Sequence, residues 1–426
     1  MNNKKHINSL AELHACTSCQ ICSAVCPVEA ISIELNGEGF FRPVVDENIC
    51  IGCQKCTKYC YKFDEEVIGS DINELSKINH YAAVTNDKEL LRKTSSGGIA
   101  SEIASYLYDI GYNVVGVFYN VQTDCPEHYI ARHKSDLPLF RGSKYIHANN
   151  EKFLKEILKK AKANGEKYAF FGLPCEVYAI DQFSRANNIR EQFILIDLYC
   201  HGVPSYLIWG KYIDGLKKNE AQPIEYSYIN FRSKSHTIWG EYRIEFQDSS
   251  EQTTYLSKNN DPFFELFFSN QLLNDSCSNC HLRGNLSYCD IRVGDFWGPK
   301  YILNRDGYSI VSANSNMGLE IINSLKGKIL FSKCDAGEFA PYQSLFNIYR
   351  PDETLRNNLL EMLTNGKKSL PEIVDYYYQH NGASGRLKYR LKSVLSLFPY
   401  RFTQIIKYFY YLIRQNKHAV RDNECL

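Results

Sequence analysis

The sequence predicts an α+β domain at its N-terminal end, followed by an α/β domain and a helical tail. Eight of the 16 cysteines fall into two equal runs between Cys16 and Cys60, which is typical of a small cluster-binding domain. Apolar strands then alternate with helices, which is the pattern of an α/β layer. From residue 352 onward the pattern is helical, first polar and then basic.

Composition and charge exclude several classes of protein. The 426 residues carry 49 Lys and Arg against 48 Asp and Glu, which argues against a generally basic nucleic-acid-binding protein. The apolar content of 44% argues against an acidic disordered chain. We find no apolar signal segment behind the first residues and no apolar run of about 18 residues, so we expect a cytoplasmic protein with reduced thiols.

The N-terminal cysteines form two repeats with the same spacing. Residues 16–27 read Cys-x2-Cys-x2-Cys-x3-Cys-Pro, and residues 50–60 repeat the four cysteines. This is the bacterial two-cluster ferredoxin spacing, in which the fourth cysteine of each run binds the other cluster. We therefore predict two [4Fe–4S] clusters. The first takes Cys16, Cys19, Cys22 and Cys60, and the second takes Cys50, Cys53, Cys56 and Cys26.

Structural zinc and disulfides are the alternatives for these cysteines. Zinc sites usually pair two CxxC motifs and do not use four-cysteine runs, which favours the clusters. Tyr61 stands where the second run would have proline, a mild departure because that proline shapes a turn and is not a ligand. We expect this domain to span residues 1–70 and to end near Gly69, before a polar stretch.

A turn of two serines and two glycines, residues 95–98, precedes an apolar helical pattern that ends at Gly111. A buried strand over residues 114–118 follows. Backbone amides and the dipole at a helix N-terminus can hold a phosphate, so the turn is a candidate phosphate site. An ordinary serine cap after a turn is the alternative.

Two further strands, residues 168–171 and 193–198, are each followed by a cysteine. Neighbouring strand ends would bring these two thiols together, and a CxxC motif farther along adds two more. Four thiols are enough for a third cluster. They belong to Cys175, Cys200, Cys277 and Cys280. Cys289 is a spare ligand, and a small core residue is the alternative for any lone cysteine.

Six motifs follow one another along the chain: Ser95–Gly98, Gly142–Tyr145, Leu173–Cys175, Tyr199–Gly202, Cys277-x2-Cys280 and Gly294–Gly298. Their order resembles that seen in the family of coenzyme F420 hydrogenase/dehydrogenase beta subunits, over roughly residues 80–345. An N-terminal ferredoxin is a common fusion in that family. The resemblance implies an N-terminal region over residues 80–180 and a C-terminal region over residues 181–350, and it leaves residues 351–426 as a helical basic tail.

The resemblance also implies which cofactors the α/β domain holds. A [4Fe–4S] cluster on the four later cysteines would lie beside an FAD. Relatives pass electrons between clusters and a two-electron carrier such as deazaflavin F420, and others occur in gene sets for bacterial polysaccharide synthesis. The family therefore fixes the cofactors better than the substrate. The FAD would be bound by Ser95, Ser96, Gly97, Gly98, Gly142, Ser143, Lys144 and Tyr145.

This cofactor set predicts an oxidoreductase. Iron–sulfur clusters move single electrons and flavin takes one or two, so a row of clusters ending at FAD connects one-electron donors to a two-electron reduction. We expect electrons to pass from the ferredoxin-type clusters through the third cluster to FAD, and on to a small molecule or F420. An electron-transfer subunit that feeds a partner enzyme is the alternative, and a cluster-bearing sensor or structural protein without flavin is a third hypothesis.

Several side chains near the motifs are candidates for the site. His201 is the best local proton source, although a hydrogen bond to cluster sulfur or backbone is favoured for it. Lys144 and Arg141 would bind FAD phosphate or an anionic substrate, with plain surface charge as the alternative. Asp295 and Trp297 either wall the flavin pocket or shape a turn.

The end of the chain is basic. Residues 386–426 contain nine Lys and Arg against two acidic residues, a charge of +7 that leaves −6 on the rest of a chain whose net charge is +1. Such a helix can lie on an anionic membrane surface. A terminal helix packed on the protein, with its basic face solvated or docked on the acidic body, is the favoured interpretation. The apolar stripe of the helix consists of Phe402, Ile405, Ile406, Phe409, Leu412 and Ile413.

Overall fold

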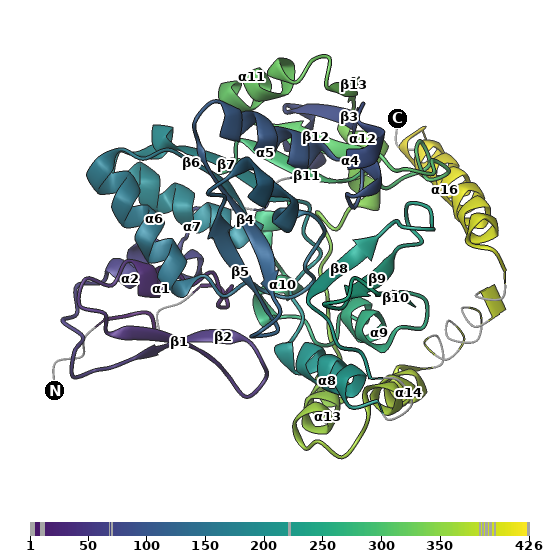
Figure 1. Ribbon diagram of the computed structural model, residues 1–426, viewed down its shortest axis with the longest axis horizontal. Helices are drawn as coiled ribbons and strands as arrows, with labels where there is room; N and C mark the ends of the chain where they lie inside the picture. The colour runs from purple at the N-terminus through teal and green to yellow at the C-terminus, as the bar shows by residue number, and fades with distance from the viewer. Residues whose placement is uncertain are drawn as a thin grey trace.

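The computed structural model is a mixed α/β fold with a small N-terminal unit, a large central sheet and a second, three-stranded sheet (Figure 1). None of the helices in the described part of the chain is long and apolar enough to cross a membrane. The structure describes residues 5–8, 13–67, 69, 71–219, 223–382, 385, 387, 391, 394–395 and 398–423, with side chains up to residue 411.

The N-terminal unit reflects the repeat in its sequence. Each cysteine run forms one helical turn, α1 (Ile21–Ala24) and α2 (Lys55–Lys58). Each turn begins after a glutamine in the left-handed region, with φ of 65° and 59°. Between the two turns, β1 (Ile31–Leu35) and β2 (Phe41–Val45) pair as an antiparallel hairpin. The two runs therefore have the same local backbone, one before and one after the hairpin in the sequence.

The tip of this hairpin is fixed to the rest of the protein. The backbone N–H of Tyr206 donates to the carbonyl of Gly39 at 2.9 Å. Gly39 has a φ of +78°, and a Cβ there would lie 2.6 Å from the hydroxyl of Ser205, so a larger residue does not fit. Arg356 also reaches Glu38 at 2.7 Å. These contacts hold the tip of the hairpin against α8 (Tyr206–Lys217) and α13 (Glu353–Thr364).

The central sheet has eight strands in the order β13-β3-β12-β11-β7-β6-β4-β5. The four strands β4, β6, β7 and β11 run parallel to one another, so their carboxyl ends lie at one edge. The predicted strands are found at β4, β6 and β7, and the sheet takes strands from both predicted regions of the α/β domain. The bounds are β3 (Asn79–Thr85), β4 (Asn113–Asn120), β5 (Cys125–Ile130), β6 (Tyr168–Phe171), β7 (Phe193–Leu198), β11 (Ile291–Asp295), β12 (Ser309–Ala313) and β13 (Ile329–Cys334).

Helices cover both faces of this sheet. Successive residues of β7 alternate, since Ile194 packs in one apolar cluster and Leu195 in another. The first face packs against α5 (Ile99–Asp109) and α11 (Asn316–Ser324). The second packs against α6 (Glu151–Asn164) and α7 (Pro174–Ala186). Three short helices complete this part of the fold, α3 (Ile72–Ser76), α4 (Lys88–Arg92) and α12 (Ala336–Phe339).

A second apolar core lies beside the large sheet. Its centre is rich in aromatic side chains, including Trp209 and Phe263, both buried. The predicted polar helical stretch from residue 352 to 380 forms two of its helices, with a break between them. The antiparallel sheet consists of β8 (Tyr228–Ser233), β9 (Arg243–Gln247) and β10 (Thr253–Ser257). The helices around it are α8 (Tyr206–Lys217), α9 (Pro262–Phe268), α10 (Asp275–Ser278), α13 (Glu353–Thr364) and α14 (Leu370–His380).

The basic tail forms a long helix, α16 (Tyr400–Asn423), and the favoured packing on the protein is found on one side of it only. A terminal helix packed on the protein would cover its apolar stripe, whereas the side chains of the stripe up to Phe409 are exposed. The buried residue is Gln404, whose Nε2 donates to the carbonyl of Ile302 at 2.9 Å. The helix is therefore held by polar contacts with backbone carbonyls. Leu412 and Ile413 lie outside the residues whose side chains are described.

A buried ion pair joins two parallel strands of the central sheet. The guanidinium of Arg292 on β11 donates to both carboxylate oxygens of Asp197 on β7, at 2.7 and 2.5 Å. Neither side chain is exposed. Arg292 also donates to the carbonyls of Leu282 and Asn285, each at 3.1 Å. One guanidinium thus fastens two strands and the loop that follows Cys280.

Replacing Arg292 with Met should lower the free energy of unfolding by about 3–5 kcal/mol, because Asp197 would be left as an uncompensated buried charge. The double variant Arg292→Met/Asp197→Leu should recover most of that loss, since it removes both charges. Guanidinium unfolding of anaerobically purified protein, followed by circular dichroism, measures the free energy of unfolding of both variants. A double variant that is less stable than Arg292→Met would contradict this account.

Candidate functional site

A cavity of about 900 Å³ opens at the carboxyl edge of the parallel strands. Its wall includes the residues that follow β6 and β7 and the end of β11. Ligands in α/β proteins bind at this edge, where loops and helix N-termini converge. Seven of the eight residues predicted to bind FAD line the cavity, and the exception is Gly97. Two segments that are far apart in the sequence thus meet around one space.

The serine-glycine turn is held tightly against β3 at the start of α5. A Cβ at Gly97 would lie 2.4 Å from the carbonyl of Ala83, and Gly98 has a φ of +81°. Only glycine suits these two positions without strain. The hydroxyl of Ser96 donates to the carbonyl of Tyr308 at 2.7 Å. The buried hydroxyl of Ser95 has no hydrogen-bond partner, so it is available to a ligand in the cavity.

The second segment supplies positive charge to the same cavity. The buried Nε of Arg141 has no hydrogen-bond partner. Lys144 donates to the carbonyls of Leu139 and Arg141, at 3.1 and 2.8 Å. Burial lowers the pKa of Lys144 to about 7. A cation that is poorly solvated in this way gains from a bound anion, which favours anion binding over plain surface charge.

An ion pair that the sequence reasoning missed also lines the cavity. Arg232 on β8 contacts both carboxylate oxygens of Asp295, at 2.5 and 3.0 Å. Burial alone would raise the pKa of Asp295, but Arg232 outweighs it and holds the pKa below its ordinary value. Trp239 donates to the same carboxylate at 2.8 Å and stacks on Trp297 at 4.6 Å. The only sequence signal for Arg232 is that it is the one charged residue in its strand, Tyr228–Ser233.

The thiols of the N-terminal unit fall into two sets. Burial raises the pKa of Cys22 most, and Cys60, Cys19 and Cys16 raise it further by their charge. Burial also raises the pKa of Cys56 most, and the charges of Cys53 and Cys26 raise it further. This division matches the predicted exchange of the fourth cysteine between the two runs. Cys53 is the exposed member of the second set, whereas Cys19 and Cys22 are buried.

The four later thiols also lie together. Burial raises the pKa of Cys200 most, and its neighbours Cys277 and Cys280 raise it further. Burial likewise raises the pKa of Cys175 most, and the charges of Cys200 and Cys280 add to the rise. Buried thiolates that repel one another need positive charge, which the iron of a cluster supplies. Among the described residues, no group of three or more His, Cys, Asp or Glu side chains is placed to hold one metal ion.

A buried arginine that the sequence reasoning missed, Arg283, lies beside the four later thiols. It donates to the carbonyl of His201 at 3.4 Å and to the carbonyl of Cys277. Its charge lowers the pKa of Cys200 and of Cys277, against the larger effect of burial. Cys289 lies elsewhere: the charged groups that act most strongly on it are Asp197 and Arg292.

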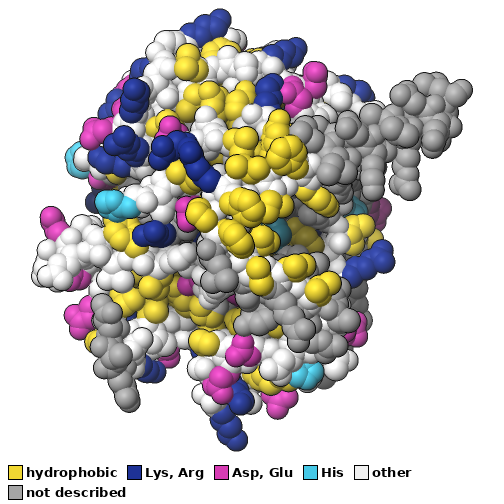
Figure 2. Space-filling model, turned by 90° about the vertical axis from the view of Figure 1, so that its right-hand side faces the viewer, with side chains coloured by type: hydrophobic (Ala, Val, Ile, Leu, Met, Phe, Trp, Pro, Cys, Tyr) yellow, Lys and Arg dark blue, Asp and Glu magenta, His cyan; other side chains and the backbone are white. Residues whose placement is uncertain are grey.

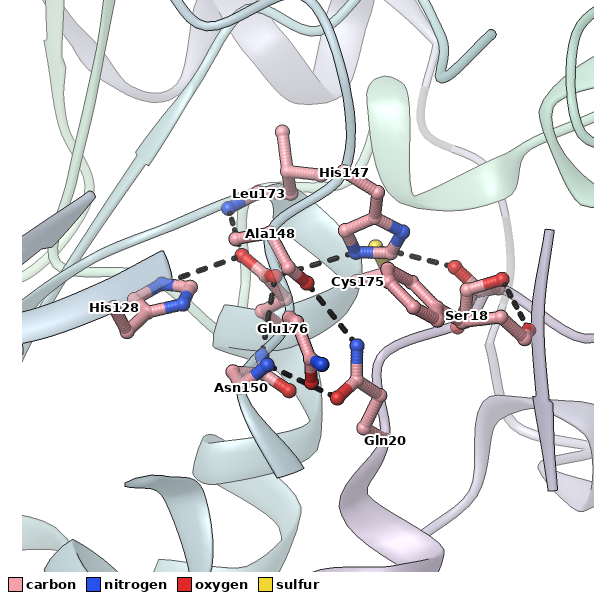
Figure 3. Close-up of polar contacts among 12 residues, drawn as sticks. Ser18, Gln20, His128, His147, Ala148, Asn150, Leu173, Cys175 and Glu176 are labelled. Carbon is pink, nitrogen blue, oxygen red and sulfur yellow. Dashed lines mark hydrogen bonds and ion pairs between the residues drawn. The ribbon is translucent and has the colours of Figure 1, made fainter. Parts of the chain in front are cut away.

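The N-terminal unit contacts the later thiol set at Cys175. The Sγ of Cys175 lies 4.0 Å from the carbonyl of Thr17, and the charge of Cys19 raises the pKa of Cys175. Figure 3 shows Gln20 reaching from the N-terminal unit toward Asn150, beside Cys175. The N–H of Asn150 donates to Gln20 at 3.0 Å. Two parts of the chain that are about 130 residues apart are thus bonded directly next to both sets of thiols.

Glu176, the residue after Cys175, lies at the centre of this contact (Figure 3). Its carboxylate accepts from the N–H of Leu173 at 2.8 Å and from Asn150 at 3.2 Å. His147 Nε2 lies 3.2 Å away and His128 Nε2 3.8 Å away. Burial would raise the pKa of Glu176, but the two histidines outweigh it and lower the pKa. The charged carboxylate holds the turn that begins α7 and carries Cys175.

His201 lines the cavity, and side chains surround its ring. Nε2 lies 2.7 Å from the side-chain oxygen of Asn270, while Nδ1 lies 3.2 Å from Ser344 and 3.1 Å from Tyr349. Burial lowers the pKa of His201. The favoured prediction for this ring was a bond to cluster sulfur or to the backbone, and the hydrogen bonds found here go to side chains.

Comparison with known proteins agrees with this arrangement. Residues 165–336 match the family model for the C terminus of the coenzyme F420 hydrogenase/dehydrogenase beta subunit, and residues 15–62 match a 4Fe-4S dicluster domain. The chain is thus similar to these beta subunits over residues 165–336 and to a 4Fe-4S dicluster domain near its N-terminal end. The family match begins just before β6 and ends at α12, so it includes all four later cysteines.

Individual relatives match only part of the chain. An F(420)H(2) dehydrogenase subunit of Methanosarcina mazei is 25% identical over 190 residues, 42% of this chain and 51% of that protein. An NADH-quinone oxidoreductase subunit of Symbiobacterium thermophilum is 34% identical over 85 residues, 18% of this chain and 35% of that one. The chain thus spans about half or less of the length of the curated relatives it matches.

A solved structure is similar to this chain at low identity. It is a chain of the F420-reducing [NiFe] hydrogenase complex from Methanosarcina barkeri, with a TM-score of 0.43 and 15% sequence identity. The similarity covers 75% of the present chain and 97% of that chain.

If Cys175 is a ligand of a third four-iron cluster, as the sequence predicts, its replacement with Ser should reduce the iron content of anaerobically purified protein from about twelve to about eight atoms. Iron and sulfide assays measure the loss, and electron paramagnetic resonance of the reduced protein should retain the signals of the ferredoxin-type pair. Cys289→Ser is the matched control and should keep the full iron content. Equal iron in the two variants would exclude Cys175 as a ligand.

Proposed function

We propose that the protein is an iron–sulfur flavoprotein oxidoreductase. Electrons pass from the ferredoxin-type clusters through a third [4Fe–4S] cluster to FAD, and on to a small-molecule substrate or deazaflavin F420. The observation that carries the proposal is the place of the later thiol set. Cys175 touches the N-terminal unit through Thr17, and Cys200 lines the cavity. A cluster on these thiols stands between the electron entry and the substrate pocket.

The burial of the thiols supports an order for the clusters. Cys53 of the second set is exposed, which suits a cluster that accepts electrons from a donor protein. Cys19 of the first set is buried and acts electrostatically on Cys175. We therefore place the second ferredoxin-type cluster at the surface, and the first between it and the third cluster.

FAD fits the cavity by the groups that surround it. The hydroxyl of Ser95 and the Nε of Arg141 are buried without partners, and both suit a pyrophosphate. Gly98 and Gly142 have positive φ, and a Cβ at either would lie 2.8 Å from a neighbouring side chain, so glycine is what lets both segments keep this backbone at the cavity wall. When bound there, FAD supplies the exchange between single electrons and electron pairs.

The chain's own residues would orient the flavin and the substrate. Arg232 and Asp295 form a rigid charged pair in the wall, braced by Trp239. Its fixed geometry suits recognition of a polar ring or an anionic group. His201, oriented by Asn270 and Ser344, is our candidate for the proton donor to the substrate.

The partners we propose are a redox donor protein or other oxidoreductase subunits, a small-molecule substrate, and a membrane surface contacted by residues 386–426. A cytoplasmic location agrees with chemistry that requires reduced thiols. A role in polysaccharide synthesis is one setting for such a reductase. The size of the cavity favours a substrate of the chain's own over the alternative of a pure electron-transfer subunit.

Protein purified without oxygen should contain about twelve irons, about twelve acid-labile sulfides and about one FAD per chain, as three four-iron clusters and one flavin require. Metal analysis, sulfide assay and the absorption spectrum measure these. Dithionite should bleach both the cluster and the flavin absorption, and a screen of oxidants then identifies compounds that restore the flavin. Zinc without visible absorption would refute the proposal, and eight irons would remove the third cluster.

FAD binding should weaken as the pH rises above about 7, because the pKa of buried Lys144 is about 7 and its charged form attracts phosphate. Lys144→Met should lower the affinity about tenfold or more at pH 6, since a charged hydrogen bond contributes about 1.5–3 kcal/mol. The variant should also lose most of the pH dependence. Fluorescence titration of flavin-depleted protein measures both effects, with Lys328→Met as the exposed control. A variant with the full pH dependence would exclude Lys144 as the titrating group.

A further inference from the structure

The helix α16 turns an apolar face away from the protein. Phe402, Ile405, Ile406, Phe409 and Tyr410 follow one another at helical spacing, and each is between 42% and 57% exposed. Residues three and four positions apart lie on the same side of a helix, so these side chains form one surface. Large apolar side chains gathered on one exposed face mark a contact with another body.

The opposite face of α16 is committed to the protein. Gln404 is only 2% exposed and donates to the carbonyls of Ile302 and Trp239. Tyr400 and Thr403 line the cavity on the same side. Because the inner face is occupied in this way, the apolar face has no place in the protein's own core.

The apolar surface continues along the segment before the helix. Figure 2 shows hydrophobic side chains gathered on the side of the molecule that carries α16. The surface is thus more extensive than the single apolar side chains that soluble proteins commonly expose. The described members of this segment with 46% to 59% exposure are Leu387, Leu391, Val394 and Phe398.

The charge of the segment indicates what covers this surface. The sequence from residue 386 to residue 421 contains nine Lys and Arg and no acidic residue. Protein surfaces intersperse both signs of charge, whereas a bilayer with anionic lipids presents one sign over its whole area. A helix with aromatic and aliphatic residues on one side and basic residues around them is the type that lies in a membrane interface.

We propose that the surface formed by the described residues between 387 and 410 docks on an anionic phospholipid bilayer. The docked helix brings the mouth of the cavity to the membrane. Phe398 is both exposed and part of the cavity wall, and Tyr400 lines the cavity from the inner side of α16. This inference rests on the membrane contact included in the proposed function, and it assigns that contact to one face of α16.

Vesicle flotation of the full-length holoprotein tests the docking. Vesicles of about three parts phosphatidylcholine to one part phosphatidylserine should carry the protein upward, and phosphatidylcholine alone should carry about tenfold less. The variant Phe402→Ser/Ile405→Ser/Phe409→Ser should float about tenfold less than wild type on the anionic vesicles. None of these three side chains lines the cavity, so iron and flavin contents should be unchanged.

The matched control is Met317→Ser/Leu330→Ser/Ile348→Ser, which removes apolar side chains of 44% to 60% exposure from other surfaces. It should float as wild type does. The orientation is tested with Phe402→Trp, whose fluorescence brominated phospholipids should quench, and with Leu330→Trp, which they should leave unchanged.

Equal flotation of the α16 variant and the control would overturn the proposal, as would a wild-type protein that does not float. Quenching of Leu330→Trp but not of Phe402→Trp would also overturn it. A partner protein that binds this face of α16 while vesicles do not would show a protein interface in place of a lipid one. The iron, sulfide and flavin assays need no lipid, so failure of the docking is distinguishable from failure of the proposed redox function.

Discussion

The buried ion pair between Arg292 and Asp197 is the interaction on which the arrangement of the site depends. It joins β7, which is followed by Cys200, to β11, which ends in Asp295. The same guanidinium holds the loop after Cys280 through Leu282. A buried arginine is stable only when its charge and its donors are satisfied, so these groups have one workable arrangement. One side chain therefore fixes both the third thiol set and one wall of the cavity.

The N-terminal unit is attached to the same sheet through α7 and the residues beside it. Cys175 begins α7 after β6, and β6 is the parallel neighbour of β7. The charged Glu176 holds that turn, and Asn150 bonds both to Glu176 and to Gln20 of the N-terminal unit. A shift of α7 would therefore move Cys175 away from both its partner thiols and the first ferredoxin-type set. The position of α7 on the sheet therefore fixes the spacing between the first ferredoxin-type thiol set and the later thiol set.

Much of the fold could be predicted from local patterns, because strands and cysteine runs have short periods. The strands at residues 168–171 and 193–198 were predicted with the observed bounds, and two parallel strands then place Cys175 and Cys200 together. Arg232 and Arg283 could not be found in this way, since each acts through contacts with distant residues. The stripe on α16 was visible in the sequence, but its direction depends on Gln404 bonding to the carbonyl of Ile302, a contact across about 100 residues.

The N-terminal unit, where we propose that electrons enter, and α16, which lies beside the cavity, are in different parts of the molecule. In Figure 1 the N-terminal unit and α16 lie on opposite sides of the molecule, with the central sheet between them. The acidic charge of −6 lies on the body and the basic charge of +7 on the segment that ends the chain. In the docking that we propose, an anionic surface would attract the α16 side and repel the body, which would turn the exposed Cys53 toward the solvent. Such an orientation would leave the proposed electron entry open to a donor protein while the cavity faced the membrane.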